Sequence, residues 1–371
     1  MEVSEASEIF NFSPGPACLP KEVLKQVQDE FMSYKGYGFS IVEMASRTPE
    51  YYDMIEEANK GLRDLLNIPE NYLLLWCQGG AYQQFTAVPF NLGQSQEASY
   101  LVSGFWSEES AKEASKFLGN VHQAWTPTEE QKFVSLPQQE DISVSKDSKY
   151  LYYCDNETIH GVEFAQPIRK DERQVPIVCD FTSNFASRRI DWDNMDVAFA
   201  GVQKNLGPSG LCSVIINQDL IGNKRKDTPI LCDWELHKNS PNNFYNTPNV
   251  FALYLTNLVI QHTKRLGVDY YDDLAKQRSS LIYDLIDNSN GFYTSKVDPK
   301  SRSRMNVSFH LKSKEEDQRF AKLAKEEGLL WLAGHAKFGG CRASMYNAMP
   351  IEGAIKLQQF MKKFQDETER L

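Results

Sequence analysis

The sequence predicts an α/β protein with a largely parallel sheet, followed by a smaller α+β domain. Between residues 72 and 217 short apolar runs alternate with helical or loop segments, which is the pattern of βα units around a sheet covered on both faces. From about residue 265 long charged helical patterns flank short strands instead. A chain of 371 residues is long enough for two such domains.

Two helical patterns precede the first strand, and each begins with a proline at a first-turn position. Pro20 leads into apolar positions at 23–31 and Pro49 into those at 51–65, so we expect both helices to pack on the core. Strands are then expected at 72–77, 100–102, 150–154, 176–180, 197–201 and 211–217. The C-terminal part is expected to form helices at 268–288, 315–327 and 351–364 and strands at 305–311 and 341–344. We place the larger domain at 18–264 and the smaller at 265–371, with 1–17 packed near the smaller domain and the functional site.

Composition excludes several classes of protein. Hydrophobic residues at 41% and charged residues at 24% are typical of a globular domain, and a net charge of −10 argues against nucleic acid or an anionic membrane as partner. The N-terminal text has no signal-peptide pattern, and no apolar run approaches the roughly 20 residues of a membrane span. Seven scattered cysteines indicate reduced thiols rather than a metal site. We therefore expect a cytoplasmic protein without a membrane anchor or a bound metal.

Candidate chemistry lies where the predicted strands end, because open α/β sheets bind ligands at the carboxyl ends of their strands. Asp180 ends one buried strand, and Lys204 follows the next one among small and turn-forming residues. Asp180 could equally be a capping residue, and most lysines are solvated. Together, however, they match a pyridoxal 5′-phosphate (PLP) site, in which a lysine carries the cofactor and an aspartate keeps its ring nitrogen protonated.

Two further strand ends fit such a site. Gly79 and Gly80 precede a predicted helix, so backbone N–H groups there could bind the cofactor phosphate, although a simple tight turn explains them equally well. Trp106 follows the strand at 100–102 and could cover the cofactor ring, with an ordinary core tryptophan as an equal alternative.

Six motifs in order along the chain then resemble those of the phosphoserine aminotransferase family, which belongs to the class-V aminotransferases. They are the segments 10–17 (FNFSPGPA), 78–81 (QGGA), 156–164 (NETIHGVEF), 203–207 (QKNLG), 245–248 (YNTP) and 342–347 (RASMYN). The resemblance implies fold type I with a mostly parallel seven-stranded sheet, PLP as cofactor and a homodimer. It also implies transfer of an amino group between L-glutamate and 3-phosphohydroxypyruvate, giving O-phospho-L-serine and 2-oxoglutarate in serine biosynthesis.

The resemblance assigns a role to individual residues. Lys204 matches the Schiff-base lysine, Asp180 the partner of the pyridine nitrogen and Trp106 the stacking ring. The remaining cofactor ligands would be Thr158 at the phenolic oxygen, and Ala81, Tyr82 and Gln203 at the phosphate, joined by Asn246 and Thr247 from the second subunit. Arg342 matches the arginine that binds the substrate α-carboxylate through a planar fork.

The substrate-phosphate pocket departs from the family, which usually has two His-Arg pairs. Here the pairs read Ser46-Arg47 and His335-Ala336, so one donor of each pair is replaced. Two lost hydrogen bonds to a charged group would weaken binding by roughly 3 to 6 kcal/mol. Lys337 could restore the charge or could simply be solvated.

Three functions therefore remain. The first is the family reaction, and the second is transamination of a different 2-oxo acid because of Ser46 and Ala336. A catalytically silent protein with a binding role is the third, opposed by the joint presence of Lys204, Asp180 and Arg342.

Overall fold

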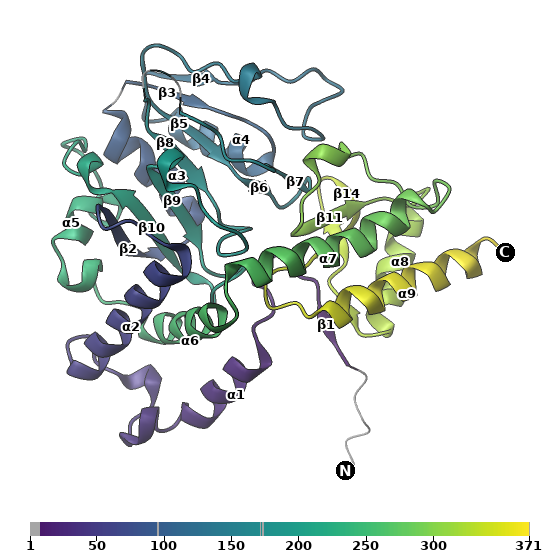
Figure 1. Cartoon of the computed structure of the whole chain (residues 1–371), viewed down its shortest axis with the longest axis horizontal. Coiled ribbons are helices and arrows are strands. Elements are labelled where there is room, and N and C mark those ends of the chain that lie inside the picture. Colours follow the sequence, from purple (N-terminus) through teal and green to yellow (C-terminus); the bar gives the residue numbers. More distant parts are fainter. Residues whose placement is uncertain (1–7, 95, 171, 173, 371) are drawn as a thin grey trace.

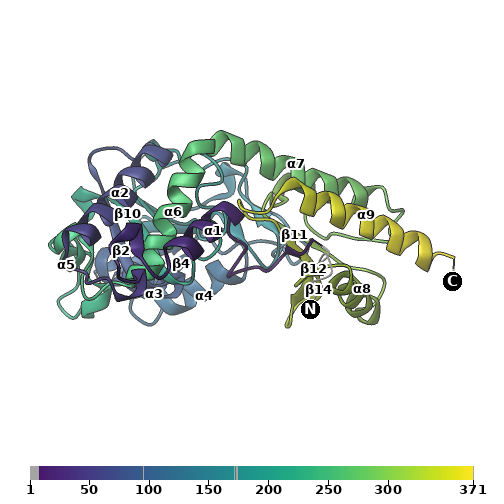
Figure 2. The same cartoon turned by 90° about the horizontal axis from the view of Figure 1, so that it is seen from below.

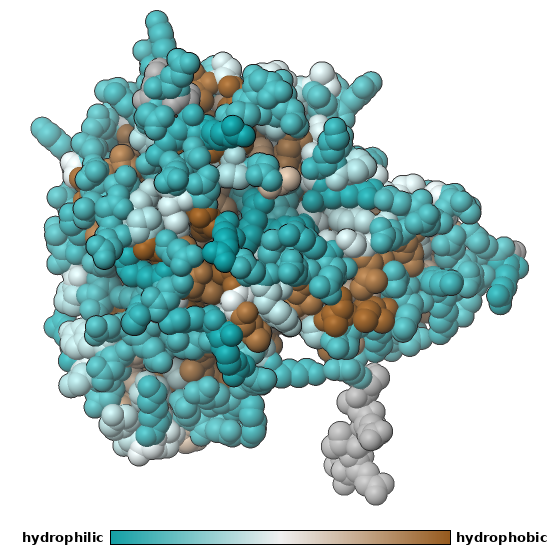
Figure 3. All heavy atoms as spheres, in the orientation of Figure 1, coloured by the Kyte–Doolittle hydropathy of each residue, from teal (hydrophilic) through white to brown (hydrophobic). Residues whose placement is uncertain are grey.

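The computed structural model describes residues 8–370 apart from 95, 171 and 173, and it divides into a large unit around one sheet and a smaller unit beside it (Figures 1 and 2). Hydrophilic residues cover most of the face seen in Figure 1, with hydrophobic residues gathered beside β1 (Phe10–Asn11) and α9 (Ile351–Thr368) (Figure 3). Among the described residues, no helix is long and apolar enough to cross a membrane.

The large unit is built on a seven-stranded sheet of order β2-β10-β9-β8-β5-β3-β4. Its strands are β2 (Tyr72–Gly79), β3 (Glu97–Tyr100), β4 (Asn120–Gln123), β5 (Ser148–Cys154), β8 (Ile177–Asp180), β9 (Val197–Gly201) and β10 (Gly210–Asn217). Only β10 runs antiparallel to its neighbours, β2 and β9. The predicted mostly parallel sheet is thus confirmed, although the pattern missed β4, which has one apolar residue, Val121.

Helices cover both faces of this sheet, which accounts for the continuously apolar strands. One hydrophobic cluster joins it to α2 (Pro49–Leu66) and α6 (Val250–Leu266), and another to α3 (Ala81–Val88), α4 (Phe105–Ala114) and α5 (Trp234–Lys238). The expectation for α1 (Lys21–Glu30) is confirmed in part, since Val23 and Val27 pack on the core while Leu24 and the following Phe31 are exposed. The apolar spacing of α1 is helical, but the helix lies on the surface (Figure 1).

The smaller unit packs α7 (Val268–Asp287), α8 (Lys314–Glu326) and α9 (Ile351–Thr368) around a sheet of order β11-β14-β13. These strands are β11 (Asn306–Phe309), β13 (Ala333–His335) and β14 (Gly339–Ser344). The N-terminal β1 (Phe10–Asn11) pairs in parallel with β12 (Leu329–Leu330), and Phe10 and Phe12 belong to the same core. Gly267 separates α6 from α7, close to the predicted boundary at 264/265, which stays a prediction.

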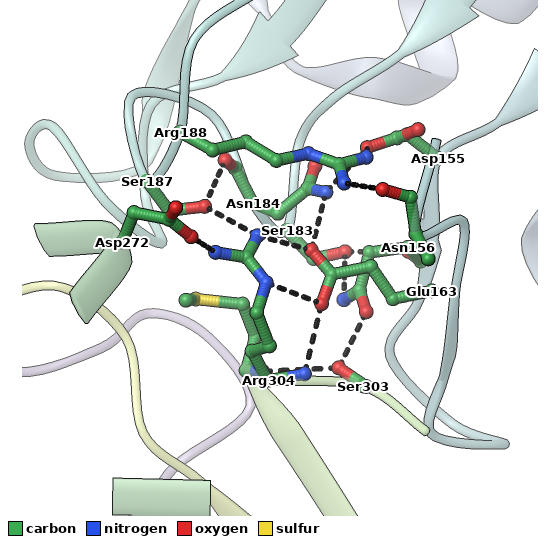
Figure 4. A network of polar contacts seen from close by, with 12 residues as sticks. Asp155, Asn156, Glu163, Ser183, Asn184, Ser187, Arg188, Asp272, Ser303 and Arg304 are labelled. Atoms are coloured by element: carbon green, nitrogen blue, oxygen red, sulfur yellow. Dashed lines mark hydrogen bonds and ion pairs between the residues drawn. The ribbon is translucent and has the colours of Figure 1, made fainter. Parts of the chain in front are cut away.

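A buried ionic network joins the two units (Figure 4). Arg304 of the smaller unit donates from its backbone N–H to Glu163 Oε2 at 2.8 Å and from Nη2 to Glu163 Oε1 at 2.6 Å, and it also pairs with Asp272 of α7. Glu163 belongs to the hairpin of β6 (Asn156–Glu157) and β7 (Val162–Glu163), which follows β5. Because β11 begins just after Arg304 and pairs Ser308 opposite Arg342, the network fixes the strand that carries Arg342 against the large unit.

Candidate active site

The carboxyl ends of the central strands meet at a cavity of about 350 Å³. Cys154 of β5 lies opposite Asp180 of β8 in the sheet, and β9 leads into Lys204 on the other side of β8. Nine predicted site residues line this cavity: Ala81, Tyr82, Trp106, Thr158, Asp180, Gln203, Lys204, His335 and Arg342. Side chains from both units therefore converge on one cavity.

Lys204 is held in the cavity by neighbouring side chains rather than by solvent. It is 9% exposed, its Nζ donates to Thr158 Oγ1 at 2.6 Å, and the same Nζ lies 5.8 Å from the centre of the Trp106 ring. A side chain at Gly15, whose φ of +125° already favours glycine, would place its Cβ 3.2 Å from Lys204 Cγ. The Lys204 side chain therefore has little access to water.

Asp180 is a buried carboxylate without an ion-pair partner among the described residues. Its Oδ1 accepts from the Thr182 backbone N–H at 2.8 Å, and it is 3% exposed. Burial raises the pKa of Asp180, and the hydrogen bonds from Thr182 and the charge of Lys204 offset this only in part. Lys204 thus acts on Asp180 through its charge and not through an ion pair. A protonated ring nitrogen is the kind of partner that such a carboxylate lacks.

The glycine turn after β2 opens α3 without a side-chain cap. Gly80 is the N-cap residue, and Ala81 and Tyr82 of the first turn line the cavity. Their backbone N–H groups belong to the helix N-terminus, where the helix dipole stabilises an anion. Gln203 lines the same cavity. These groups fit the phosphate of PLP.

Arg342 brings a cation from the smaller unit to the same cavity. It is 6% exposed, its Nε has no hydrogen-bond partner among the described residues, and burial lowers its pKa. Burial, together with the charges of Arg342 and Lys337, also lowers the pKa of His335. A buried guanidinium with an unpartnered nitrogen fits a carboxylate ligand.

Four predicted residues lie in a second cavity, of about 540 Å³. Ser46, Arg47, Asn246 and Thr247 line it and do not line the first. Gln78 of β2 contacts two of these residues, because its side chain accepts from Asn246 Nδ2 at 3.4 Å and donates to the Thr247 carbonyl. Within one chain, therefore, the structure does not bring Arg47 together with His335.

Lys337 lies beside the first cavity without lining it. Its Nζ is 5.3 Å from the ring centre of Phe338 and 6.0 Å from that of Phe105. Burial and the charges of His335 and Lys337 lower the pKa of His160 to about 4, which places all three side chains in one neighbourhood. The sequence carries no signal for His160 beyond its place in the 156–164 motif.

Several lining residues were missed as individual site residues. Pro14, Gly15, Asn156, Ile159, Thr182 and Ser183 line the first cavity. The first four lie inside motifs that the sequence analysis quoted, so the motif itself was the available signal. Thr182 and Ser183 follow Asp180 directly, and position after a strand end was the rule that could have found them.

Comparison with known proteins agrees with this geometry. The family model described as "Aminotransferase class-V" matches residues 9–357. The chain belongs to the class-V aminotransferase family, and it is an aminotransferase enzyme. Phosphoserine aminotransferase 2, chloroplastic, of Arabidopsis thaliana is 40% identical over 98% of this chain and 86% of its own length. A probable phosphoserine aminotransferase of Caenorhabditis elegans is 41% identical over 96% of each chain.

Solved structures of similar fold carry the same family name. Phosphoserine aminotransferase from Bacillus circulans subsp. alkalophilus aligns with a TM-score of 0.93 at 37% identity over 98% of this chain and all of its own. PLP-bound phosphoserine aminotransferase from Trichomonas vaginalis aligns with a TM-score of 0.89 at 34% identity, over 96% of this chain and all of its own. The fold-type expectation is confirmed, and PLP is the cofactor that this site takes.

Proposed function

We propose that this chain transfers an amino group between L-glutamate and 3-phosphohydroxypyruvate, giving O-phospho-L-serine and 2-oxoglutarate in serine biosynthesis. The observation that carries the proposal is the unpartnered, buried guanidinium of Arg342 in the cavity that also holds Lys204 and Asp180. An α-carboxylate is common to both substrates, and a planar guanidinium binds it through two hydrogen bonds. The names of relatives about 40% identical over nearly the whole chain support the choice of substrate.

Cofactor binding is assigned to the large unit. When bound, PLP supplies an electron sink for the substrate α-carbon. Lys204 would hold its carbonyl end, Asp180 the ring nitrogen, Trp106 one ring face and Thr158 the phenolic oxygen. Ala81, Tyr82 and Gln203 would hold its phosphate. The burial of Asp180 and the open first turn of α3 support these assignments.

Proton transfer is assigned to Lys204. With the cofactor and substrate bound, its amine would move a proton at the substrate α-carbon. Thr158 orients the Lys204 side chain by accepting from its Nζ at 2.6 Å. Arg342 holds the α-carboxylate, so the α-carbon stays within reach of Lys204 while the walls of the cavity exclude water.

The active enzyme is proposed to be a homodimer that completes each site. Asn246 and Thr247 of one copy would reach the cofactor phosphate of the other, and Arg47 would reach the substrate phosphate. Their position in a separate cavity, outside the one that Lys204 and Asp180 line, supports a contribution across an interface rather than within one chain.

The substrate phosphate is assigned to His335, to Lys337 and to Arg47 from the second copy. Lys337 stands where it lowers the pKa of His335, so its charge reaches this end of the cavity. The ammonium would partly replace the cation lost at Ala336, as a point charge rather than a fork. A cytoplasmic location is part of the same proposal, and cell fractionation would check it.

Half-reactions on the purified holoenzyme test the function. L-Glutamate should bleach the visible absorbance of the bound cofactor, and low concentrations of 3-phosphohydroxypyruvate should restore it. Hydroxypyruvate and pyruvate are the controls without phosphate. Restoration by these acids alone would mean that Ser46 and Ala336 have redirected the enzyme to another 2-oxo acid, and the proposed substrate would be wrong.

A further inference from the structure

Glu157 is a buried carboxylate that serves a helix rather than the cavity. It is 0% exposed and does not line the first cavity, yet it immediately precedes Thr158. Its Oε2 accepts from the Trp106 backbone N–H at 2.9 Å, and its Oε1 accepts from the Ser107 N–H at 2.8 Å and from Ser107 Oγ at 2.6 Å. The carboxylate thus takes three donors from the first turn of α4.

The residue before this turn leaves room for the carboxylate. Gly104 is the N-cap of α4 and has a φ of −173°, an extended conformation that any residue adopts. A Cβ at Gly104 would nevertheless lie 2.4 Å from Glu157 Cδ and 2.6 Å from its Oε2. Packing against Glu157, and not backbone strain, therefore requires glycine here.

Trp106, which donates to Glu157, and Thr158, which follows it in the chain, both lie close to Lys204 Nζ. The backbone N–H of Trp106 donates to Glu157, and the Trp106 ring lies 5.8 Å from Lys204 Nζ. Thr158 accepts from the same Nζ. Burial raises the pKa of Glu157 to about 7 despite the hydrogen bonds from Ser107 and Trp106, so a charge at this place is costly. An apolar residue would avoid that cost, but it could not hold three donors in a fixed direction.

We propose that Glu157 is a positioning residue, whose carboxylate fixes the first turn of α4 and thereby the orientation of the Trp106 ring over the cofactor. The inference rests on the proposed assignment of Trp106 as the ring that covers PLP. Glu157 touches neither cofactor nor substrate and acts through the backbone of α4. Loss of this contact should change how the cofactor is seated before it changes the chemistry of Lys204.

Glu157→Gln in the holoenzyme at pH 8 tests the proposal. The amide keeps the shape of the side chain but turns an NH₂ group toward at least one donor of α4. We expect the visible circular dichroism of the bound cofactor to fall clearly and its dissociation constant to rise about tenfold or more, the size expected for a lost hydrogen bond to a charged group. Gly104→Ala should give the same change, because its methyl group displaces the carboxylate.

Glu163→Gln is the matched control. Glu163 is an equally buried carboxylate of the same hairpin, 3% exposed, but it accepts from Arg304 and Asn184 and faces the smaller unit. This variant should lower global stability and leave the circular dichroism of the cofactor unchanged. If both variants change the cofactor signal in proportion to lost stability, Glu157 has only a structural role and the proposal is overturned.

A double-mutant cycle with Trp106→Phe separates this inference from the function on which it rests. Trp106→Phe alone should reduce energy transfer from tryptophan to the cofactor and change the visible circular dichroism. If it changes neither, the assignment of Trp106 fails. If it changes both, the effect of Glu157→Gln should largely disappear when Trp106→Phe is also present, and an equal effect with and without that second substitution would overturn the positioning role.

Discussion

The two cavities differ in whether their charged and polar site residues are buried or exposed. In the first, Lys204, Asp180 and Arg342 are buried, and the chain itself fixes each by packing or hydrogen bonds. In the second, Arg47 and Asn246 are exposed, and no ion pair holds Arg47 among the described residues. Burial of unpartnered charge is costly, so a single chain organises the chemistry in the first cavity. The second cavity has the features of a surface that another copy of the chain completes.

Removal of Lys204 should lower turnover more than any other change described below. In Lys204→Ala, turnover should fall by about 10⁴-fold or more, because the amine that moves the proton at the α-carbon is lost. Steady-state kinetics with glutamate and 3-phosphohydroxypyruvate measure it, with Thr158→Val as a milder control that loses only the 2.6 Å contact. Turnover within tenfold of wild type would remove Lys204 from the chemistry.

Mixed dimers test whether the second cavity acts across an interface. Lys204→Ala and Arg47→Ala homodimers should each be impaired, but dissociation and reassembly of an equal mixture should recover about a quarter of wild-type activity. Random pairing makes half of the dimers mixed, and each mixed dimer has one intact site. Activity that stays at the average of the two parents would show that Arg47 acts within its own chain.

The pH dependence of stability should reflect the burial of Glu157, which lies beside the first cavity but does not line it. Burial raises the pKa of Glu157 to about 7 from an ordinary 4.5, so the folded chain holds a proton that the unfolded chain has released between these values. The contribution of this group to stability therefore falls by about 3 kcal/mol as the pH rises from 4.5 to 7. In Glu157→Gln, the free energy of unfolding measured with urea should no longer show this decrease between pH 4.5 and 7.

Glu163→Gln should change the same measurement with the opposite sign. Burial opposes ionisation at Glu163, but the charges of Arg304 and Arg188 outweigh it and hold the pKa below its ordinary value of 4.5. Its contribution is present above pH 4.5 and is lost as the pH falls, so the variant should lose stability mainly at neutral pH. An identical pH profile for the two variants would contradict both signs.

The smallest effect is expected at Lys337, which is exposed and lies near His335 of the first cavity. Lys337→Ala should lower kcat/KM for 3-phosphohydroxypyruvate by about threefold to tenfold, since an exposed ammonium contributes about 1 kcal/mol. The value for unphosphorylated hydroxypyruvate should not change. Equal losses for both acids would place Lys337 outside the phosphate subsite.

Elements with strong apolar patterns were predicted well, and those without were missed. β9 and β2 stand within two residues of their expected bounds because both contain a continuous run of mostly apolar residues. β4 and β13 were not predicted, since their residues are mostly polar or small and neighbouring strands supply the pairing. Apolar spacing likewise predicted that α1 is a helix, but not that it lies on the surface.

The sequence by itself determined the chemistry of the site: an amine at Lys204, a carboxylate at Asp180 and a guanidinium at Arg342, each in a recognisable motif. Tertiary structure decided which of these share a cavity, because strand order and the contact between the two units join residues more than a hundred positions apart. It separated Arg47 and Asn246 from that cavity, and it placed Glu157 behind Trp106. Local sequence patterns indicate which chemistry a residue can perform. Only long-range packing decides which other residues lie close enough to take part in it.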